Sequence, residues 1–311
     1  MNQNDKLLQP FSVSRATYKC GATERKILFF AALKVQQQST ANPNISEYSA
    51  EFALSEILKT LGMNNTQGNR ELIKNAVKTI AQNSLILAED EKNLDVVNWL
   101  QRGIFNTDNN TVTLIFSNLI GELFYTCKQR YSLINPRVIG AIKSFYAMRY
   151  YEISLSYNGF SPWRFYYSLD ELRTMYQIDG YQYSTGTAEF IRRVVTYPIE
   201  ELNKVNPDFV IELEKVTDEN DKRRTKGFYF NCKKYGAKTK ATTKTSSKRS
   251  QKVLKGINEA EEERKPFERF DTLYHEEFRR RIDELKRRNP LELEATAQEK
   301  AYKSMVADGY K

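Results

Sequence analysis

Two adjacent arginines stand in the segment EFIRRVVTYPIEELNKVN, residues 189–206, whose apolar residues have the spacing of an amphipathic helix. Arg192 and Arg193 lie on the polar side of this helix, together with Thr187 and Thr196. An arginine can donate two hydrogen bonds to O6 and N7 of a guanine in the major groove, a contact worth roughly 1–3 kcal/mol of discrimination. This chemistry predicts that the segment reads bases.

A second basic stripe lies in residues 70–78. Arg70, Lys74 and Lys78 recur every four residues, so they share one side of a helix. The apolar face expected opposite them comprises Leu72, Ile73, Ala76, Val77 and Ile80. Lysine mostly contacts phosphate, which positions a protein on DNA without reading its sequence. A basic stripe is more often only the solvated face of a helix, so the place of each stripe in the fold must decide between these interpretations.

The two basic helices occupy equivalent places in an internal duplication. ALSEILKTLGMN, residues 53–64, aligns with SLDELRTMYQID, residues 168–179, and ELIKNAVK aligns with EFIRRVVT, residues 189–196. The aligned segments share their apolar positions, and the offset changes only in the turn between the helices, where insertions are tolerated. Ser168 and Glu171 also fit a capping box, which predicts where the first helix of the second copy begins.

A β-hairpin is expected after the second helix of each copy. The strands expected in the first copy are SLILAED, DVVNWLQRGIFN and NTVTLIFS, with a turn at residues 108–110. Those expected in the second copy are DFVIELEKV and TKGFYFNC, around a basic loop. Because such a loop would lie along phosphates or enter the minor groove, its basic residues complete the predicted DNA-binding site. They are Lys222, Arg223, Arg224 and Lys226.

Helix, turn, helix and hairpin, occurring twice, is the plan of a pair of winged-helix domains. We therefore predict an α+β fold of two tandem winged-helix domains, at residues 1–130 and 131–235, with a basic extension at residues 236–311. In the extension, residues 238–255 carry only basic charges and are typical of a linker or a DNA tether. Residues 259–289 have helical spacing and would either dock on the protein or bind a partner.

Pro198 stands where the helix of the two arginines should continue. Proline has no N–H and clashes with the carbonyl four residues earlier. The helix therefore either kinks at Pro198 or stops at Thr196 and restarts with the proline in its first turn.

Composition and charge restrict the classes of function. The net charge of +9 favours a polyanionic partner. The chain has one histidine, His275, and no GxxxxGK[ST] loop, so we expect neither a nuclease with a paired-histidine metal site nor a P-loop ATPase. We expect no enzyme activity, no catalytic residue, no cofactor and no metal. The apolar runs are too short to span a membrane and the three cysteines are far apart, so we expect a cytoplasmic protein without a membrane partner.

The second copy closely resembles the second winged helix of plasmid replication initiators of the RepA, RepB and RepE type. That family has a Phe-(x)-Arg-Arg-Val helix that runs into a Pro-x-x-Glu-(x)-Asn segment. The matching residues here are Phe190, Arg192, Arg193, Val194, Pro198, Glu201 and Asn203. Residues 134–153 resemble the family's linking helix, with Lys143, Tyr146, Arg149 and Tyr150 in its aromatic and basic pattern. The resemblance covers residues 7–232 and departs from the family at residues 195–197, where a Leu-Asp pair is common.

The resemblance implies a sequence-specific protein that initiates plasmid replication on double-stranded DNA. Such proteins bind repeated origin sites, called iterons, promote opening of the origin, and recruit the host initiator and the replicative helicase. They often repress their own gene as dimers, in equilibrium with monomers, which contributes to copy control. In the dimer the first winged helix largely forms the interface, while the second is the main reader of DNA. The implied location is the bacterial cytoplasm, with the nucleoid or plasmid. The alternative is a tandem winged-helix transcriptional regulator without a role in replication.

Overall fold

The computed structural model describes residues 6–41, 45, 47–89, 92–127, 130–178, 183, 186–218 and 221–235, and isolated positions between 280 and 305. The chain forms two compact units, Met1–Lys238 and Thr239–Lys311. The linker predicted at residues 238–255 and His275 lie outside the described residues. Of the helix predicted at residues 259–289, only residues 280, 281 and 284 are described, and these are helical.

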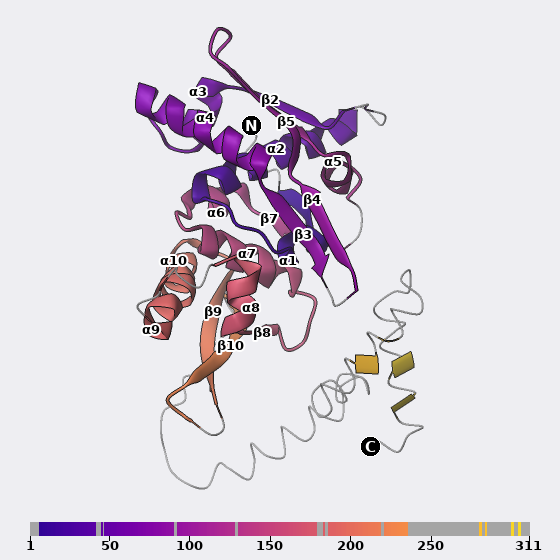
Figure 1. Cartoon of the computed structure of the whole chain (residues 1–311), viewed down its shortest axis with the longest axis vertical. Helices are drawn as coiled ribbons and strands as arrows, with labels where there is room; N and C mark the ends of the chain where they lie inside the picture. Colours follow the sequence, from indigo (N-terminus) through magenta and orange to yellow (C-terminus); the bar gives the residue numbers. More distant parts are fainter. Residues whose placement is uncertain are drawn as a thin grey trace. The chain divides into compact units, whose positions relative to one another are not determined.

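A first winged helix occupies the N-terminal part of the first unit (Figure 1). Its elements are α2 (Ala22–Ala41), β2 (Ser49–Ala53), α3 (Leu54–Thr60), α4 (Gln67–Gln82), β5 (Leu100–Asn106) and β6 (Thr111–Phe116). The strands form an antiparallel sheet in the order β2-β6-β5. A separate hairpin of β3 (Ser84–Glu89) and β4 (Leu94–Asn98) lies in the chain between α4 and β5, and α5 (Asn118–Tyr125) follows β6.

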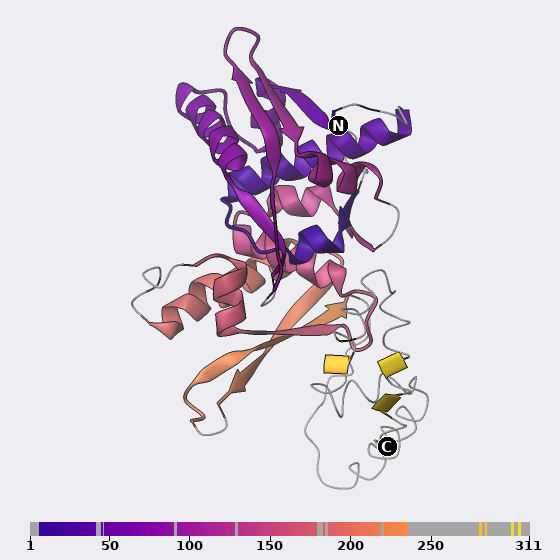
Figure 2. The same ribbon diagram turned by 45° about the vertical axis from the view of Figure 1, so that its right-hand side comes forward.

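A second winged helix repeats this order. Its elements are α7 (Phe145–Ser156), β8 (Arg164–Ser168), α8 (Leu169–Met175), α9 (Thr187–Phe190), the π-helical segment η1 (Ile191–Thr196), α10 (Tyr197–Val205), β9 (Phe209–Thr217) and β10 (Thr225–Lys234). The sheet order is β8-β10-β9, so in both copies the strand before the helix-turn-helix pairs with the second strand of the hairpin. The long β9–β10 hairpin, called the wing below, projects from this domain (Figure 2). The predicted fold of two duplicated winged helices is confirmed.

The capping box predicted at the start of the second copy is also confirmed. The Ser168 N–H donates to Oε2 of Glu171 at 2.7 Å, and the Glu171 N–H donates to Oγ of Ser168 at 3.1 Å. This reciprocal pair satisfies two donors that the first turn of α8 would otherwise leave unpaired.

The segment predicted as one linking helix at residues 134–153 is two helices, α6 (Pro136–Ala141) and α7. The side chain of Ser144 accepts a hydrogen bond from the Ala147 N–H and so caps α7. The carboxylate of Glu201, on α10, accepts from the backbone N–H groups of Lys143 and Ser144 at 2.6 and 3.1 Å. An anion favours the N-terminus of a helix, so Glu201 reinforces the break.

A buried charge network joins the two winged helices. Arg25 on α2 and Arg149 on α7 both contact Glu152 of α7, with N–O distances of 2.6 and 3.2 Å, and all three side chains are fully buried. Arg149 also donates to the carbonyl oxygen of Ala16 at 2.7 Å and to the hydroxyl of Tyr18 at 3.0 Å. Burial raises the pKa of Tyr18 to about 12, so this phenol stays neutral. Arg149 of the resemblance is thus a structural residue inside the protein.

The N-terminal segment packs against α7. It forms β1 (Leu7–Pro10), which pairs with β7 (Tyr131–Ile134), and α1 (Phe11–Arg15). Arg15 donates to Oγ and to the carbonyl oxygen of Ser156, at the end of α7, at 3.0 and 2.8 Å.

Among the described residues, no helix is both long enough and apolar enough to span a bilayer.

Candidate nucleic-acid interface

The helix that carries the two arginines continues through Pro198. It consists of α9, η1 and α10, residues 187–205, and is called the recognition helix below. In η1 the Tyr197 N–H bonds to the carbonyl oxygen of Arg192, five residues earlier. η1 ends at Thr196 and α10 begins at Tyr197 with Pro198 in its first turn, as one of the two predicted alternatives had it, but the chain stays helical across this boundary and does not stop.

The apolar side of the recognition helix is anchored in the domain core. Phe190, Val194 and Val195 are fully buried, and Ile191 is partly buried. At the far end, the side chain of Asn203 accepts from the Ile211 N–H and donates to the Ile211 carbonyl oxygen, at 2.8 and 2.9 Å, which fixes α10 to strand β9. The polar side is therefore held toward solvent by packing and by hydrogen bonds.

Both arginines contact one carboxylate. Nε of Arg192 donates to Oε2 of Glu189 at 2.7 Å, and NH2 of Arg192 lies 2.5 Å from the same oxygen. Nε of Arg193 donates to the other oxygen, Oε1. The hydrogen bond from Arg193, followed by that from Arg192, holds the pKa of Glu189 below its usual value. The arginine side chains are 49% and 59% exposed, so both can reach a ligand.

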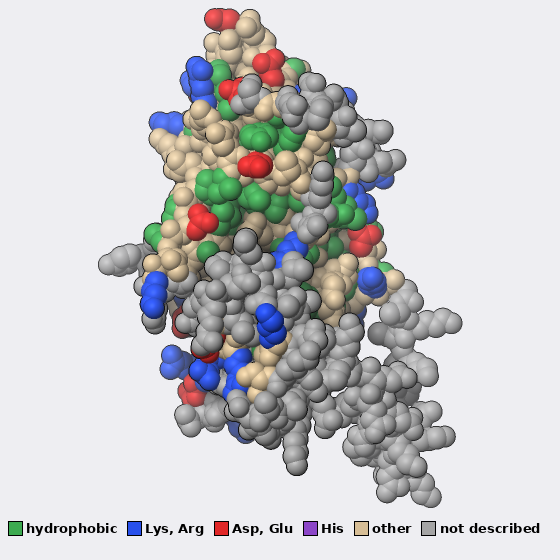
Figure 3. All heavy atoms as spheres, turned by 90° about the vertical axis from the view of Figure 1, so that its right-hand side faces the viewer, with side chains coloured by type: hydrophobic (Ala, Val, Ile, Leu, Met, Phe, Trp, Pro, Cys, Tyr) green, Lys and Arg blue, Asp and Glu red, His purple; other side chains and the backbone are tan. Residues whose placement is uncertain are grey.

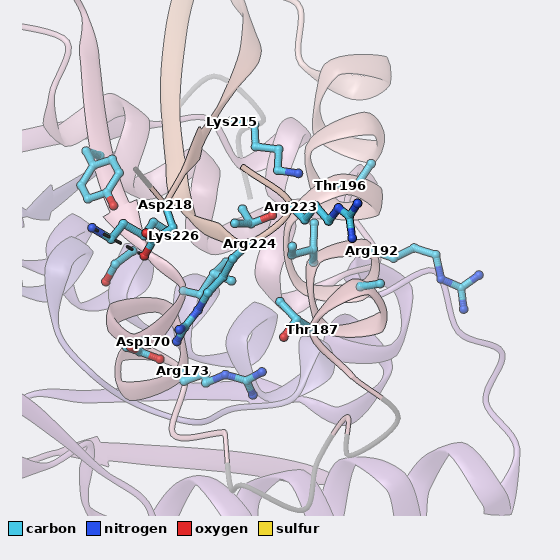
Figure 4. A pocket seen from close by; sticks show the side chains of 16 residues that line it. Asp170, Arg173, Thr187, Arg192, Thr196, Lys215, Asp218, Arg223, Arg224 and Lys226 are labelled. Carbon is cyan, nitrogen blue, oxygen red and sulfur yellow. Dashed lines mark ion pairs between the residues drawn. The ribbon is translucent and has the colours of Figure 1, made fainter. Parts of the chain in front are cut away.

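A basic groove lies between the recognition helix, α8 and the wing, with a volume of about 990 Å³. Six of its lining residues are basic: Arg173, Arg192, Lys215, Arg223, Arg224 and Lys226. The acidic lining residues are Asp170 and Asp218, and Nζ of Lys226 lies 4.0 Å from Oδ2 of Asp218. In Figure 4, Arg224 reaches from the wing toward Asp170 and Arg173 of α8. This excess of positive charge in a concave surface suits a phosphate chain.

The structure brings most of the predicted second-copy residues together in the groove. These are Thr187, Arg192, Thr196, Arg223, Arg224 and Lys226. Arg193 and Lys222 are exposed but do not line it. At the wing turn, the Arg223 N–H donates to Oδ1 of Asp221 at 3.0 Å, and this hydrogen bond stabilises the backbone of the turn that carries the arginines.

Two groove residues were missed from the sequence. Arg173 lies on α8, with its guanidinium carbon 4.0 Å from the centroid of the Phe190 ring, and Lys215 lies on β9. Both are basic residues on elements next to the predicted site. Their place in the groove depends on how α8 and β9 pack against the recognition helix. The spacing of residues along a single element gives no information on that packing.

The first copy presents its basic stripe differently. Nε of Arg70 donates to Oδ1 of Asn65 at 2.8 Å, while Nζ of Lys74 lies 3.7 Å from Glu71. Lys74 and Lys78 are exposed. The prediction that Leu72 belongs to the apolar face was wrong, because Leu72 is 41% exposed while the other four predicted positions are buried. Leu72 precedes the buried Ile73 and is turned about 100° away from it on the helix.

Apolar side chains are also exposed elsewhere in the first copy. They include Leu94 and Val96 on β4, at 62% and 48%, and Leu119 on α5, at 45%. Figure 3 views the side on which β4 and α5 lie in Figure 1 and shows hydrophobic side chains gathered there. Exposed apolar clusters commonly mark surfaces that bind another protein.

No group of three or more His, Cys, Asp and Glu side chains lies close enough to hold a metal ion within the described part of the chain. The three cysteines, Cys20, Cys127 and Cys232, are free thiols. Burial raises the pKa of Cys20 to about 12 and that of Cys127 to about 11, so both thiols stay protonated near neutral pH.

Comparison with known proteins gives two family matches. Residues 9–154 match the family described as Initiator Replication protein, WH1, and residues 168–232 match the one described as Initiator Rep protein, WH2. No curated protein matches the chain. Among solved structures, the Pi initiator protein in complex with iteron DNA is 15% identical, with a TM-score of 0.49 over 75% of this chain and 98% of that one. Domains 2 and 3 of RctB are 13% identical, with a TM-score of 0.41 over 68% of this chain and 82% of that one.

Proposed function

Because the chain belongs to the family of initiator replication proteins, with both winged helices matched, we propose that it binds repeated origin sites on double-stranded DNA and starts plasmid replication there. In this proposal the bound protein promotes opening of the origin and recruits the host initiator and the replicative helicase. It acts by binding and remodelling DNA in the bacterial cytoplasm, on the plasmid or nucleoid, and not as an enzyme.

The basic groove of the second winged helix is the observation that carries this proposal. A recognition helix in the major groove and a wing at the neighbouring minor groove leave one phosphate strand between them. Arg173, Lys215 and Arg224 line the groove between those two elements, so they are proposed to contact that strand. Arg193 stands outside the groove on the exposed side of the helix, where base edges would lie. The second winged helix is therefore proposed as the main reader.

The first winged helix is proposed to form a dimer that represses the protein's own gene and so limits copy number. The exposed apolar residues of β4 support this proposal, because pairing would cover them. Leu94→Ser combined with Val96→Ser should lower self-association measured by sedimentation, while the melting temperature stays within about 2 °C because both side chains are already solvated. Unchanged self-association would place the dimer contact elsewhere.

The direct test of the proposed function is a footprint of the full chain across the DNA that flanks its own gene, at moderate salt with random competitor present. We expect protection of several equally spaced direct repeats. Protection of a single inverted repeat alone would instead favour a transcriptional regulator. Binding without any protected sequence would overturn sequence-specific recognition altogether.

A further inference from the structure

Glu189 lies between the two arginines at the start of the recognition helix. It precedes Arg192 by three residues and Arg193 by four, which are the spacings at which helical side chains meet. Each carboxylate oxygen accepts from a different arginine, so one anion serves two cations. The Glu189 side chain is only 21% exposed, because Arg192 and Arg193 cover it.

The two arginines differ in the donors that they retain. Arg192 uses Nε and NH2 on Glu189, and its NH1 donates to the hydroxyl of Tyr197 at 3.2 Å. Arg193 uses only Nε, and among the described residues nothing bonds its NH1 or NH2. A guanine in the major groove accepts two parallel hydrogen bonds from one guanidinium. Arg193 can form them from its two terminal nitrogens without releasing Glu189, whereas Arg192 must first break a contact inside the protein.

We propose that Glu189 is a positioning residue that sets the base specificity of this protein, by holding Arg193 through Nε so that its terminal nitrogens face a guanine. The inference rests on the proposed function and extends it to one residue and one base. Glu189 itself contacts no base in this proposal. Arg192, tied to Glu189 and Tyr197, lines the groove and serves the phosphate strand.

Two physical effects support this role. A free arginine loses much side-chain rotamer freedom when it binds, and a guanidinium already held at Nε loses less, so its guanine contact is strengthened. The carboxylate also repels phosphate, which carries the same charge, and so weakens contacts that any DNA sequence could make. Both effects raise the ratio of specific to non-specific binding.

The first copy supplies a matched control. Glu71 occupies the aligned position on α4, and its carboxylate lies 3.7 Å from Nζ of Lys74. Glu71→Gln removes the same charge from the aligned position on α4, the second helix of the helix-turn-helix in the first copy. Lysine presents no planar pair of donors, so Glu71 has no guanine contact to organise.

The test selects duplexes from a pool with a random core, using the full-length wild type, Glu189→Gln, Glu71→Gln and Arg193→Lys in parallel. The wild type should enrich a motif that contains guanine. Glu189→Gln should lose the preference at one guanine position, with a fall of about tenfold in the ratio of motif to random affinity. Its affinity for random duplexes should rise, and the salt dependence of that binding should steepen by about one phosphate contact.

Arg193→Lys keeps the charge without the pair of terminal donors, so it should lose the preference at the same position. Glu71→Gln should leave the motif unchanged. Thermal melting checks that each variant is folded; Glu71 and Arg193 are exposed and Glu189→Gln conserves side-chain size, so we expect melting temperatures close to the wild type.

The outcomes separate this inference from the proposed function. If the wild type enriches no motif, the proposed function fails. If it enriches a motif that Glu189→Gln or Arg193→Lys retains, the positioning role alone is overturned. If Glu189→Gln and Glu71→Gln both raised the affinity for motif and random duplexes by the same factor, Glu189 would act only as a negative charge that repels any DNA. Loss of a cytosine preference would make Glu189 a base contact, because a carboxylate accepts from cytosine N4.

Discussion

The two winged helices share their topology and differ in the chemistry of their exposed surfaces. Both pair the strand before the helix-turn-helix with the second strand of the hairpin. In the first copy, α4 is an uninterrupted α-helix, and the hairpin turn carries Asp108, Asn109 and Asn110. In the second copy, the recognition helix contains a π segment, and the wing carries Arg223 and Arg224. The shared plan therefore specifies a fold, and a few exposed side chains specify what each copy can bind.

The contrast extends to how each copy treats its cations. In the first copy, Arg70 bonds to Asn65 and to Asn110 of the hairpin turn, and Lys74 lies near Glu71 on α4. In the second copy, basic residues from the recognition helix, α8 and the wing line one groove. Cations from several elements add their fields in a concave surface, whereas a stripe on one convex helix is screened by water. The second copy should consequently dominate DNA binding.

The largest effect is expected where the two copies meet. Glu152→Gln would leave Arg25 and Arg149 buried without their carboxylate, which should cost about 3–5 kcal/mol of unfolding free energy. Thermal unfolding should show a melting temperature lower by roughly 10 °C. Glu71→Gln, at a half-exposed position, is the control and should change stability by less than about 0.5 kcal/mol. A loss below about 1 kcal/mol for Glu152→Gln would mean that the network does not hold the two copies together.

The next effect concerns the recognition helix of the second copy. Arg193→Ala should weaken binding to a selected motif by about 1–3 kcal/mol, because it removes a guanine contact, and should weaken binding to random duplexes less. Arg192→Ala should also lose more on the motif than on random DNA, because it removes one of the two contacts that hold Glu189, the residue that positions Arg193. Competition titrations with both duplexes measure the ratio. Equal losses on the two duplexes for Arg193→Ala would contradict base reading by Arg193.

A smaller and different effect is expected in the groove. Arg224→Ala should weaken binding to all sequences alike and should lower the slope of log K against log salt by about 0.9, the value for one phosphate contact. A salt series on motif and random duplexes provides the measurement. A loss confined to the motif would move Arg224 from the phosphate strand to a base edge.

The smallest effect is expected in the first copy. Lys74→Ala should weaken binding to motif and random duplexes equally and flatten the salt dependence, by less than Arg224→Ala, because Lys74 lies on an exposed helix face outside the basic groove and is paired with Glu71. The same salt series tests it. If Lys74→Ala matched or exceeded Arg224→Ala, the two copies would contribute equally to DNA binding, and the proposed division between them would fail.

Much of the fold was predictable because its determinants are local. The 3.6-residue spacing of apolar side chains located α3, α4, α8 and the recognition helix, and alternation located β9 and β10. The capping box at Ser168 and Glu171 was readable because its two members are three residues apart. The link between Glu189 and the arginine pair has the same short range, and the rule for residues three and four apart could have found it.

What remained hidden depends on contacts between segments distant in the chain. Arg173 and Lys215 join the site only because α8 and β9 pack beside the recognition helix. Arg149, which the sequence placed in the aromatic and basic pattern of a linking helix, is buried because Glu152 compensates its charge and carbonyl and hydroxyl oxygens accept its hydrogen bonds. The sequence by itself determined the duplicated helices, the β5–β6 and β9–β10 hairpins and the positions of the basic residues, since these follow from local spacing; the division of the strand expected at DVVNWLQRGIFN into β4 and β5 was not predicted. Only the tertiary structure decided which charges are buried, which are tied to a neighbour and which share one groove, because those depend on packing and desolvation across the whole unit.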